Sequence, residues 1–212
     1  MKFKLSALLF LVFFSVIAVP FPQRSDQDVK TQQDLINKIN QSPRNPEYRF
    51  ELAMEFAATG WIELGWEQLK LVPALEKNYE EVVFKKYSAI LASDPQNWQA
   101  HFRLAFAYYF MDEKEKAIES FKKVLKIYPD HVWSMGLIAL LYGEQKNHKE
   151  CIAWTKRGLA INNDATALHF LLGQAYYETG NYFGVLGETL SVGRLKSIEA
   201  KYRPIPPIGI EP

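Results

Sequence analysis

The sequence has little of the chemistry on which most enzymes and nucleic-acid-binding proteins depend. It contains one cysteine, Cys151, which excludes an intramolecular disulfide. Its formal net charge of +1 provides neither a basic field for nucleic acid nor an acidic field for a cationic partner. The four histidines have no short metal-ligand spacing, and there is no G-x-S-x-G, Walker or G-x-G-x-x-G motif. These absences favour a non-catalytic protein that needs no cofactor and no metal.

A pattern of paired helices starts at Trp98 and ends at Pro129, with a short polar turn at Asp112 between the two helices. The pattern returns after a shift of 34 residues. The positions that coincide are Leu104, Ile138 and Leu172; Ala105, Ala139 and Gly173; Tyr108, Tyr142 and Tyr176; and Ala117, Cys151 and Val185. A fixed period of this length is typical of a repeat protein.

The residue types at these positions have a physical reason. Antiparallel helices approach to roughly 8–10 Å only where small side chains let ridges enter grooves. Ala105, Ala117, Cys151 and Gly173 are such small positions. One helical hairpin cannot bury its apolar face alone, so several must stack into a continuous core. The sequence therefore predicts an all-α fold, an α-α superhelix built from antiparallel hairpins.

The repeated residues resemble the tetratricopeptide repeat family. The match is best over residues 98–131, good over 132–165 and clear in the first half of 166–199. A further first helix, NPEYRFELAMEFAATG, spans Asn45–Gly60. The resemblance implies a solenoid of helix hairpins with a concave groove lined by the first helices. It implies a binding role in general and no single function.

The pattern divides the chain into five parts. They are a signal peptide or membrane anchor at 1–22, a linker and capping helix at 23–44, a divergent repeat unit at 45–97, three repeats at 98–199 (98–131, 132–165 and 166–199), and a proline-rich extended tail at 200–212.

Residues 61–93 allow two interpretations, because two apparent second helices follow one another there. In the first, helices at 29–40 and 46–59 form one divergent hairpin and helices at 62–77 and 79–93 form the next, which restores the 34-residue frame from about residue 30. In the second, an irregular three-helix unit precedes three regular repeats, and this arrangement is slightly favoured.

The first 22 residues have the pattern of a targeting segment. Lys2 and Lys4 precede an apolar run over residues 5–19, which is short for a membrane span of roughly 17–25 residues. We expect a cleaved signal peptide, or alternatively an uncleaved segment that attaches the protein to a membrane. Either leader predicts an exported protein in a periplasmic or other extracytoplasmic location.

The 34-residue register also predicts which side chains line the groove, and these are mainly aromatic. They are Phe50, Met54, Phe102, Phe106, Tyr109, Phe110, Trp133, Phe170, Gln174 and Tyr177. The family's carboxylate clamp needs lysine and asparagine in the groove, where this sequence has apolar residues, so an acidic chaperone tail is not the expected ligand. Either these side chains bind a hydrophobic or amphipathic peptide, or other parts of the chain cover them.

The expected function is a non-catalytic scaffold or assembly factor of the cell envelope that binds a protein or peptide partner in this groove. The alternative is a carrier that holds an apolar small molecule or lipid in the same groove. His101 and His169 fall at a packing position of the repeat, and we expect them to fill the core. Cys151 is expected to be a buried, inert thiol.

Overall fold

The computed structural model describes residues 26–199 and Pro207, and in this part of the chain all regular elements are helices. They are α2 (Asp26–Gln41), α3 (Pro46–Ala58), α4 (Ile62–Leu75), α5 (Tyr79–Ser93), α6 (Trp98–Phe110), α7 (Lys114–Ile127), α8 (Val132–Glu144), α9 (His148–Ile161), α10 (Thr166–Glu178) and α11 (Tyr182–Glu199). The prediction of an all-α solenoid of helix hairpins is confirmed.

Most first helices start at a side chain that accepts a hydrogen bond from their first turn. Asn45 Oδ1 accepts from the Tyr48 N–H at 3.1 Å, and Asn97 Oδ1 accepts from the Ala100 N–H at 2.9 Å. The turns inside the hairpins share a left-handed residue, with φ of 60° at Asp112, 60° at Lys146 and 76° at Gly180. These residues lie 34 positions apart, so the repeat in sequence is also a repeat in backbone conformation.

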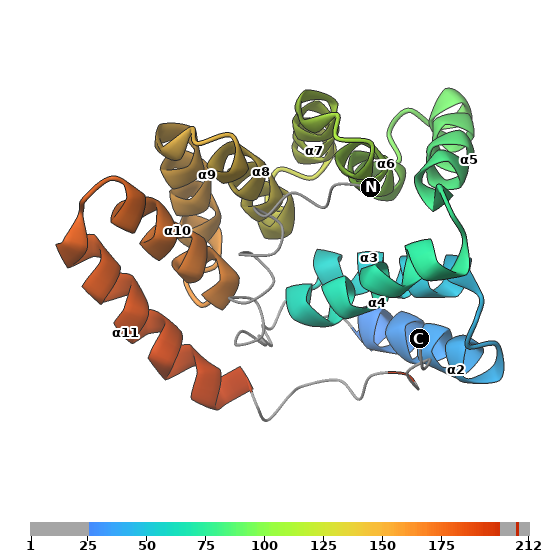
Figure 1. The fold of residues 1–212 in the computed structure, drawn as a ribbon, viewed down its shortest axis with the longest axis horizontal. Helices are drawn as coiled ribbons and strands as arrows, with labels where there is room; N and C mark the ends of the chain where they lie inside the picture. Colours follow the sequence, from blue (N-terminus) through green and yellow to red (C-terminus); the bar gives the residue numbers. More distant parts are fainter. Residues whose placement is uncertain (1–25, 200–206, 208–212) are drawn as a thin grey trace.

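Helices α5 to α11 form an arc (Figure 1). Helices α6 and α7, α8 and α9, and α10 and α11 pack as hairpins, and α5 packs against α6 at the start of the arc. Close contact is made through small residues: a Cβ added to Gly158 on α9 would lie 2.6 Å from Leu168 Cδ1 on α10. The three hairpins stack as the spacing of their small residues predicts.

Helices α2, α3 and α4 form a separate three-helix unit. Helix α4 packs against α3 rather than against α5, and α2 also packs against α3. Pro73 lies inside α4, and the backbone then leaves the helical path through extended Glu76 and left-handed Asn78. The hairpin of residues 62–77 with 79–93 is therefore not formed, although its residues keep the 34-residue spacing.

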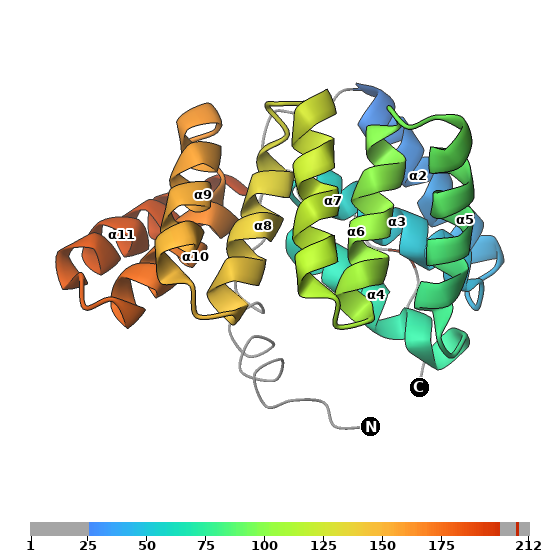
Figure 2. The same ribbon diagram turned by 90° about the horizontal axis from the view of Figure 1, so that it is seen from above.

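The three-helix unit lies inside the curve of the arc (Figures 1 and 2). Phe50 and Met54 of α3 share one hydrophobic core with Phe102 and Phe106 of α6. Helix α3 also contacts α8. Gly60, just after the end of α3, lies against the ring of Trp133 on α8. The inner face of the arc is thus covered at α6 and at the start of α8.

Between Asp26 and Glu199 no helix combines the length and the hydropathy that a membrane crossing requires. The leader predicted at residues 1–22 lies outside the described residues, and so does the tail predicted at 200–212 apart from Pro207, which is buried and not helical.

Candidate functional site

The ten side chains predicted to line a groove differ in burial. Five are buried in the core: Phe50, Met54, Phe102, Phe106 and Trp133. Tyr109 and Phe170 are half-buried, whereas Phe110, Gln174 and Tyr177 are exposed. The expectation of an open groove is corrected for the first five, because Phe50 and Met54 of α3 pack into one core with Phe102 and Phe106, and Trp133 lies against Gly60.

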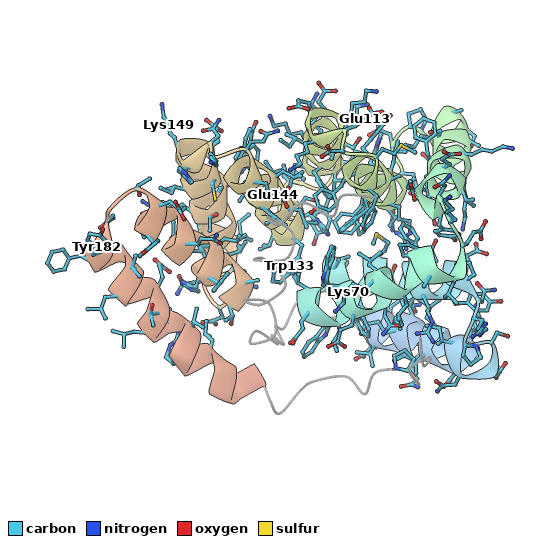
Figure 3. The ribbon with its side chains drawn as sticks, in the orientation of Figure 1. Lys70, Glu113, Trp133, Glu144, Lys149 and Tyr182 are labelled. Atoms are coloured by element: carbon cyan, nitrogen blue, oxygen red, sulfur yellow. The ribbon has the colours of Figure 1, made fainter. Side chains whose placement is uncertain are left out.

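The covered group is closely packed. The ring of Phe102 lies edge-on to Phe106 at 5.4 Å and to Phe121 at 5.6 Å between centroids. Figure 3 shows Trp133 between the arc and the three-helix unit. A partner could reach these rings only by displacing α3, so they serve the core of the described fold.

Apart from Phe110 of α6, the exposed residues of the predicted groove lie on α10. Phe170, Gln174 and Tyr177 are spaced four and three residues apart and therefore form one stripe, which we call the α10 stripe. Tyr177 is 62% exposed. The half-buried Leu140 of α8 occupies the register position of Gln174, and α8 packs against α10. This surface combines apolar rings with an amide that can both donate and accept hydrogen bonds.

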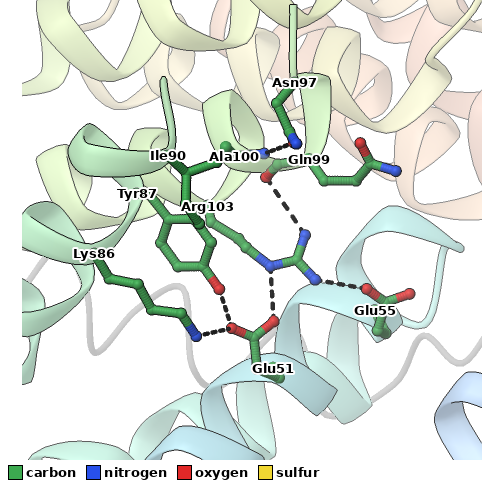
Figure 4. A pocket seen from close by; sticks show the side chains of 9 residues that line it. All are labelled: Glu51, Glu55, Lys86, Tyr87, Ile90, Asn97, Gln99, Ala100 and Arg103. Atoms are coloured by element: carbon green, nitrogen blue, oxygen red, sulfur yellow. Dashed lines mark hydrogen bonds and ion pairs between the residues drawn. The ribbon is translucent and has the colours of Figure 1, made fainter. Parts of the chain in front are cut away.

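A second feature is a polar hollow of about 530 Å³ where α3 meets α5 and α6 (Figure 4). Arg103 of α6 donates from Nε to Glu51 Oε2 and from an Nη to Glu55 Oε1, both at 2.7 Å. Tyr87 of α5 donates to Glu51, and Lys86 donates to Glu47 at 2.7 Å. This network joins α3 to α5 and α6, which are distant from it in sequence.

Burial and charge compete in this network. Burial alone would raise the pKa of the Glu51 carboxyl, but the Arg103 charge, the hydrogen bonds from Tyr87 and Arg103, and Lys86 lower it below its ordinary value. Burial and the neighbouring Glu51 raise the pKa of Tyr87 to about 12. Glu51 is therefore charged and Tyr87 is protonated at neutral pH.

The hollow joins the three-helix unit to the arc. Its charged groups satisfy one another, an arrangement that holds α3 in place and provides no nucleophile or activated base. Sequence reasoning missed the hollow because Glu51 and Arg103 are 52 residues apart. One signal was available: Arg103 is the only Arg, Lys, Asp or Glu in the helix WQAHFRLAFAYYF, and a lone arginine on an apolar helix needs buried carboxylates as partners.

The arrangement of hairpins agrees with comparison to known proteins. A family model described as "Tetratricopeptide repeat" matches residues 98–131, the segment with the best match in the sequence. Residues 98–131 are a tetratricopeptide repeat. The search of curated protein sequences found no match.

Two solved structures share the arrangement of helices. MamA 41-end from Desulfovibrio magneticus RS-1 aligns with a TM-score of 0.55 and 15% identity, over 82% of this chain and 97% of that chain. The MamA RS-1 ArsTM double mutant aligns with a TM-score of 0.53 and 13% identity, over 82% of this chain and 88% of that one. At this identity the likeness concerns the fold alone. Tetratricopeptide repeats are typical of non-catalytic protein-interaction scaffolds that bind protein partners.

Three of the histidines, His101, His131 and His169, have structural roles. His101 and His169 are buried as expected, and each also bonds a carbonyl six residues earlier: Pro95 O at 3.0 Å and Asn163 O at 2.7 Å. His131 caps α8, with Nδ1 accepting from the Ser134 N–H at 3.2 Å. Burial lowers the pKa of His131 to about 4. Each histidine thus fixes a loop or a helix start.

Cys151 is a free, buried thiol whose pKa is raised by burial. Its environment is that of a packing residue and not of a nucleophile. Among residues 26–199 no three His, Cys, Asp or Glu side chains are grouped so that they could hold a metal ion.

Proposed function

We propose that this protein is a scaffold of the cell envelope that binds a segment of a protein partner along the α10 stripe. The observation that carries the proposal is the contrast between the two halves of the inner face. On α6 the predicted groove residues Phe102 and Phe106 are buried against α3, while on α10 the equivalent residues are less buried: Phe170 is half-buried and Gln174 is exposed. The part of the inner face that can meet a partner is therefore its C-terminal half.

The chemistry of the α10 stripe defines the partner. Burying the Tyr177 ring would contribute at most roughly 1.5–3 kcal/mol, so affinity needs an apolar side chain opposite it. Gln174 lies one turn away and can pair with a backbone or side-chain amide of the partner. An extended or helical segment with alternating apolar and polar groups fits these requirements. No charged side chain lies among the three residues of the stripe, so binding should depend little on salt.

The alternative of an apolar small-molecule or lipid carrier has no comparable support. The hollow at α3, α5 and α6 is lined mainly by charged and polar groups, which do not favour a lipid chain. The envelope location is supported by the predicted leader, the basic Lys2 and Lys4 followed by the apolar run at 5–19.

The binding surface can be tested by photocrosslinking in the source cells with a benzoylphenylalanine in place of Tyr177, and at Lys149 as control. Lys149 is exposed on α9 and points away from the inner face (Figure 3). We expect a protein adduct from position 177 alone. The purified partner should then bind Tyr177→Ala at least about tenfold more weakly than the parent protein. Equal binding by Tyr177→Ala would reject the α10 stripe.

The location is tested separately by fractionating the source cells and measuring the intact mass of the protein. Recovery in the envelope or periplasm supports the proposal, with the mass showing whether the leader has been removed. Recovery of the protein in the cytoplasm would overturn the envelope role but leave the binding surface open to its own test.

A further inference from the structure

The last helix, α11, exposes an apolar face that its neighbours do not cover. Phe183 is 92% exposed, Leu186 is 59% exposed and Leu190 is 68% exposed. With Gly187 these residues form one side of the helix, since they are spaced three, four and seven residues apart. We call this side the α11 face. Large apolar side chains on one continuous surface mark an interaction site more often than scattered ones do.

The 34-residue register shows that this face departs from the earlier hairpins. Leu190 stands where α7 has Lys122 and α9 has Lys156. Each of these lysines places its ammonium over a tyrosine of the following helix, at 5.6 Å from the Tyr142 ring and 5.5 Å from the Tyr176 ring.

Phe183 also differs from the residues at its register position in the earlier hairpins. These are Glu115 of α7 and Lys149 of α9, both exposed and charged. At these two positions the α11 face is apolar where the earlier hairpins carry charge, whereas Leu186 keeps the apolar character of Ile118 and Ile152. The face is therefore more apolar than the corresponding side of an earlier hairpin.

The helix that would follow α11 in register falls at residues 200–212, where Pro204, Pro206 and Pro207 stand at positions that are helical in α8 and α10. Pro207 belongs to the described part of the chain and is not helical. The prolines therefore break the helix pattern by which α8 covers α7 and α10 covers α9.

We propose that the α11 face pairs with the same face of a second copy of this protein. A two-fold axis requires a self-complementary surface, on which each residue meets its counterpart reciprocally. Phe183 and Leu190 are two turns apart, about 10 Å along the helix, with Leu186 and Gly187 between them. In an antiparallel pair, each Phe183 lies against Leu190 of the other copy, and Leu186 lies against Gly187.

Two further observations fit a second copy. A Cβ built on Gly187 meets none of the described atoms within 4 Å, so the centre of the face is open to a close helix. The nearby charges have partners within the chain: Glu188 pairs with His169 at 2.5 Å, and Arg194, one turn beyond Leu190, pairs with Asp164 at 3.4 Å. An uncharged face needs an uncharged partner face, and α11 offers one with matching spacing. This interface is separate from the α10 stripe and does not rest on the proposed function.

The test is sedimentation of the full chain over a concentration series, with Leu190→Lys as the variant. This change restores the lysine that α7 and α9 carry, and the exposed side chain should leave helix content and melting temperature unchanged. Each dimer would bury two ammonium groups, so we expect the dissociation constant to rise by about 100-fold or more. Val82→Lys is the control, because Val82 is 44% exposed on α5 and outside the α11 face; it should leave the dimer intact.

A second measurement tests the direction of pairing. A Phe183→Cys chain oxidised together with a Leu190→Cys chain should form a disulfide between copies, whereas Phe183→Cys with Val82→Cys should not. A parent protein that stays monomeric, or a dimer that Leu190→Lys does not weaken, would overturn the proposal. Binding of monomers to phosphatidylcholine vesicles that is lost in Leu190→Lys would also overturn it, and would assign the face to a lipid surface.

Discussion

Gly60, at the left-handed turn that ends α3, lies directly against the indole ring of Trp133 at the start of α8. The two residues are 73 positions apart in the sequence and belong to different parts of the fold. Their contact fixes how far the three-helix unit enters the curve of the arc. Two independent reasons require glycine at position 60. Its φ of 92° is unfavourable for other residues, and the Trp133 ring leaves no room for a Cβ.

Gly60→Ala is expected to destabilise the fold by about 2–4 kcal/mol, measured by chemical denaturation. The added methyl group would overlap the Trp133 ring, lying 2.9 Å from Cε2, and alanine is strained at this φ. Gly180→Ala is the matched control, because Gly180 has φ of 76° and a Cβ there meets no described atom within 4 Å. It should cost about 1 kcal/mol, the strain alone. Equal losses in the two variants would contradict the contact with Trp133.

Arg103→Ala is expected to lower the free energy of unfolding by about 3 kcal/mol, the lower end for a broken buried ion pair. Arg103 is only 9% exposed, and its loss leaves Glu55 without the ion pair that Arg103 supplies. Lys86→Ala removes a more exposed cation of the same network and should cost less than about 1 kcal/mol. If the two variants lose the same stability in a urea titration, the hollow does not hold α3 in place.

The stability of the protein is expected to fall as the pH drops from about 6.5 to about 4, because of His131. The folded state keeps this ring neutral with a pKa of about 4, while in the unfolded chain the ring titrates near 6.5. The unfolded state therefore binds more protons in this window, which lowers stability by up to about 3 kcal/mol at its acid end.

His131→Asn should remove that dependence and keep the helix cap, since asparagine caps α3, α6 and α9 in the same way. Loss of stability should then begin only below about 4.5, where Glu51, whose pKa is lowered in the fold, starts to be protonated in the unfolded chain. Unfolding midpoints measured across pH for both proteins test this. An unchanged slope between pH 6.5 and 4 in His131→Asn would show that another group is responsible.

The regular part of the fold was predictable because its cause is local. Small residues at Ala105, Ala117 and Cys151 recur with one period, and any chain with that pattern must stack its hairpins to bury the large residues between them. The helix starts at Asn45 and Asn97 are likewise visible in the sequence, because capping needs only residues within one turn.

The position of the three-helix unit was not predictable from such a pattern. Extended Glu76 and left-handed Asn78 set the direction in which the chain leaves α4 and enters α5. Such a change of direction occurs once, so it leaves no repeating pattern in the sequence. The register places Phe102 and Phe106 on the inner face but does not show that α3 covers them. That depends on contacts between α3 and α6, which are made by residues about 50 positions apart.

The placement of α3 across the arc has a consequence for how the protein unfolds. A chain of stacked repeats opens from its ends, since each repeat contacts only its neighbours. Here α3 joins α6 and α8, so the first half of the arc and the three-helix unit should melt in one cooperative step, with α10 and α11 free to fray earlier. The long sequence separation of these contacts should also slow folding relative to a simple helical array.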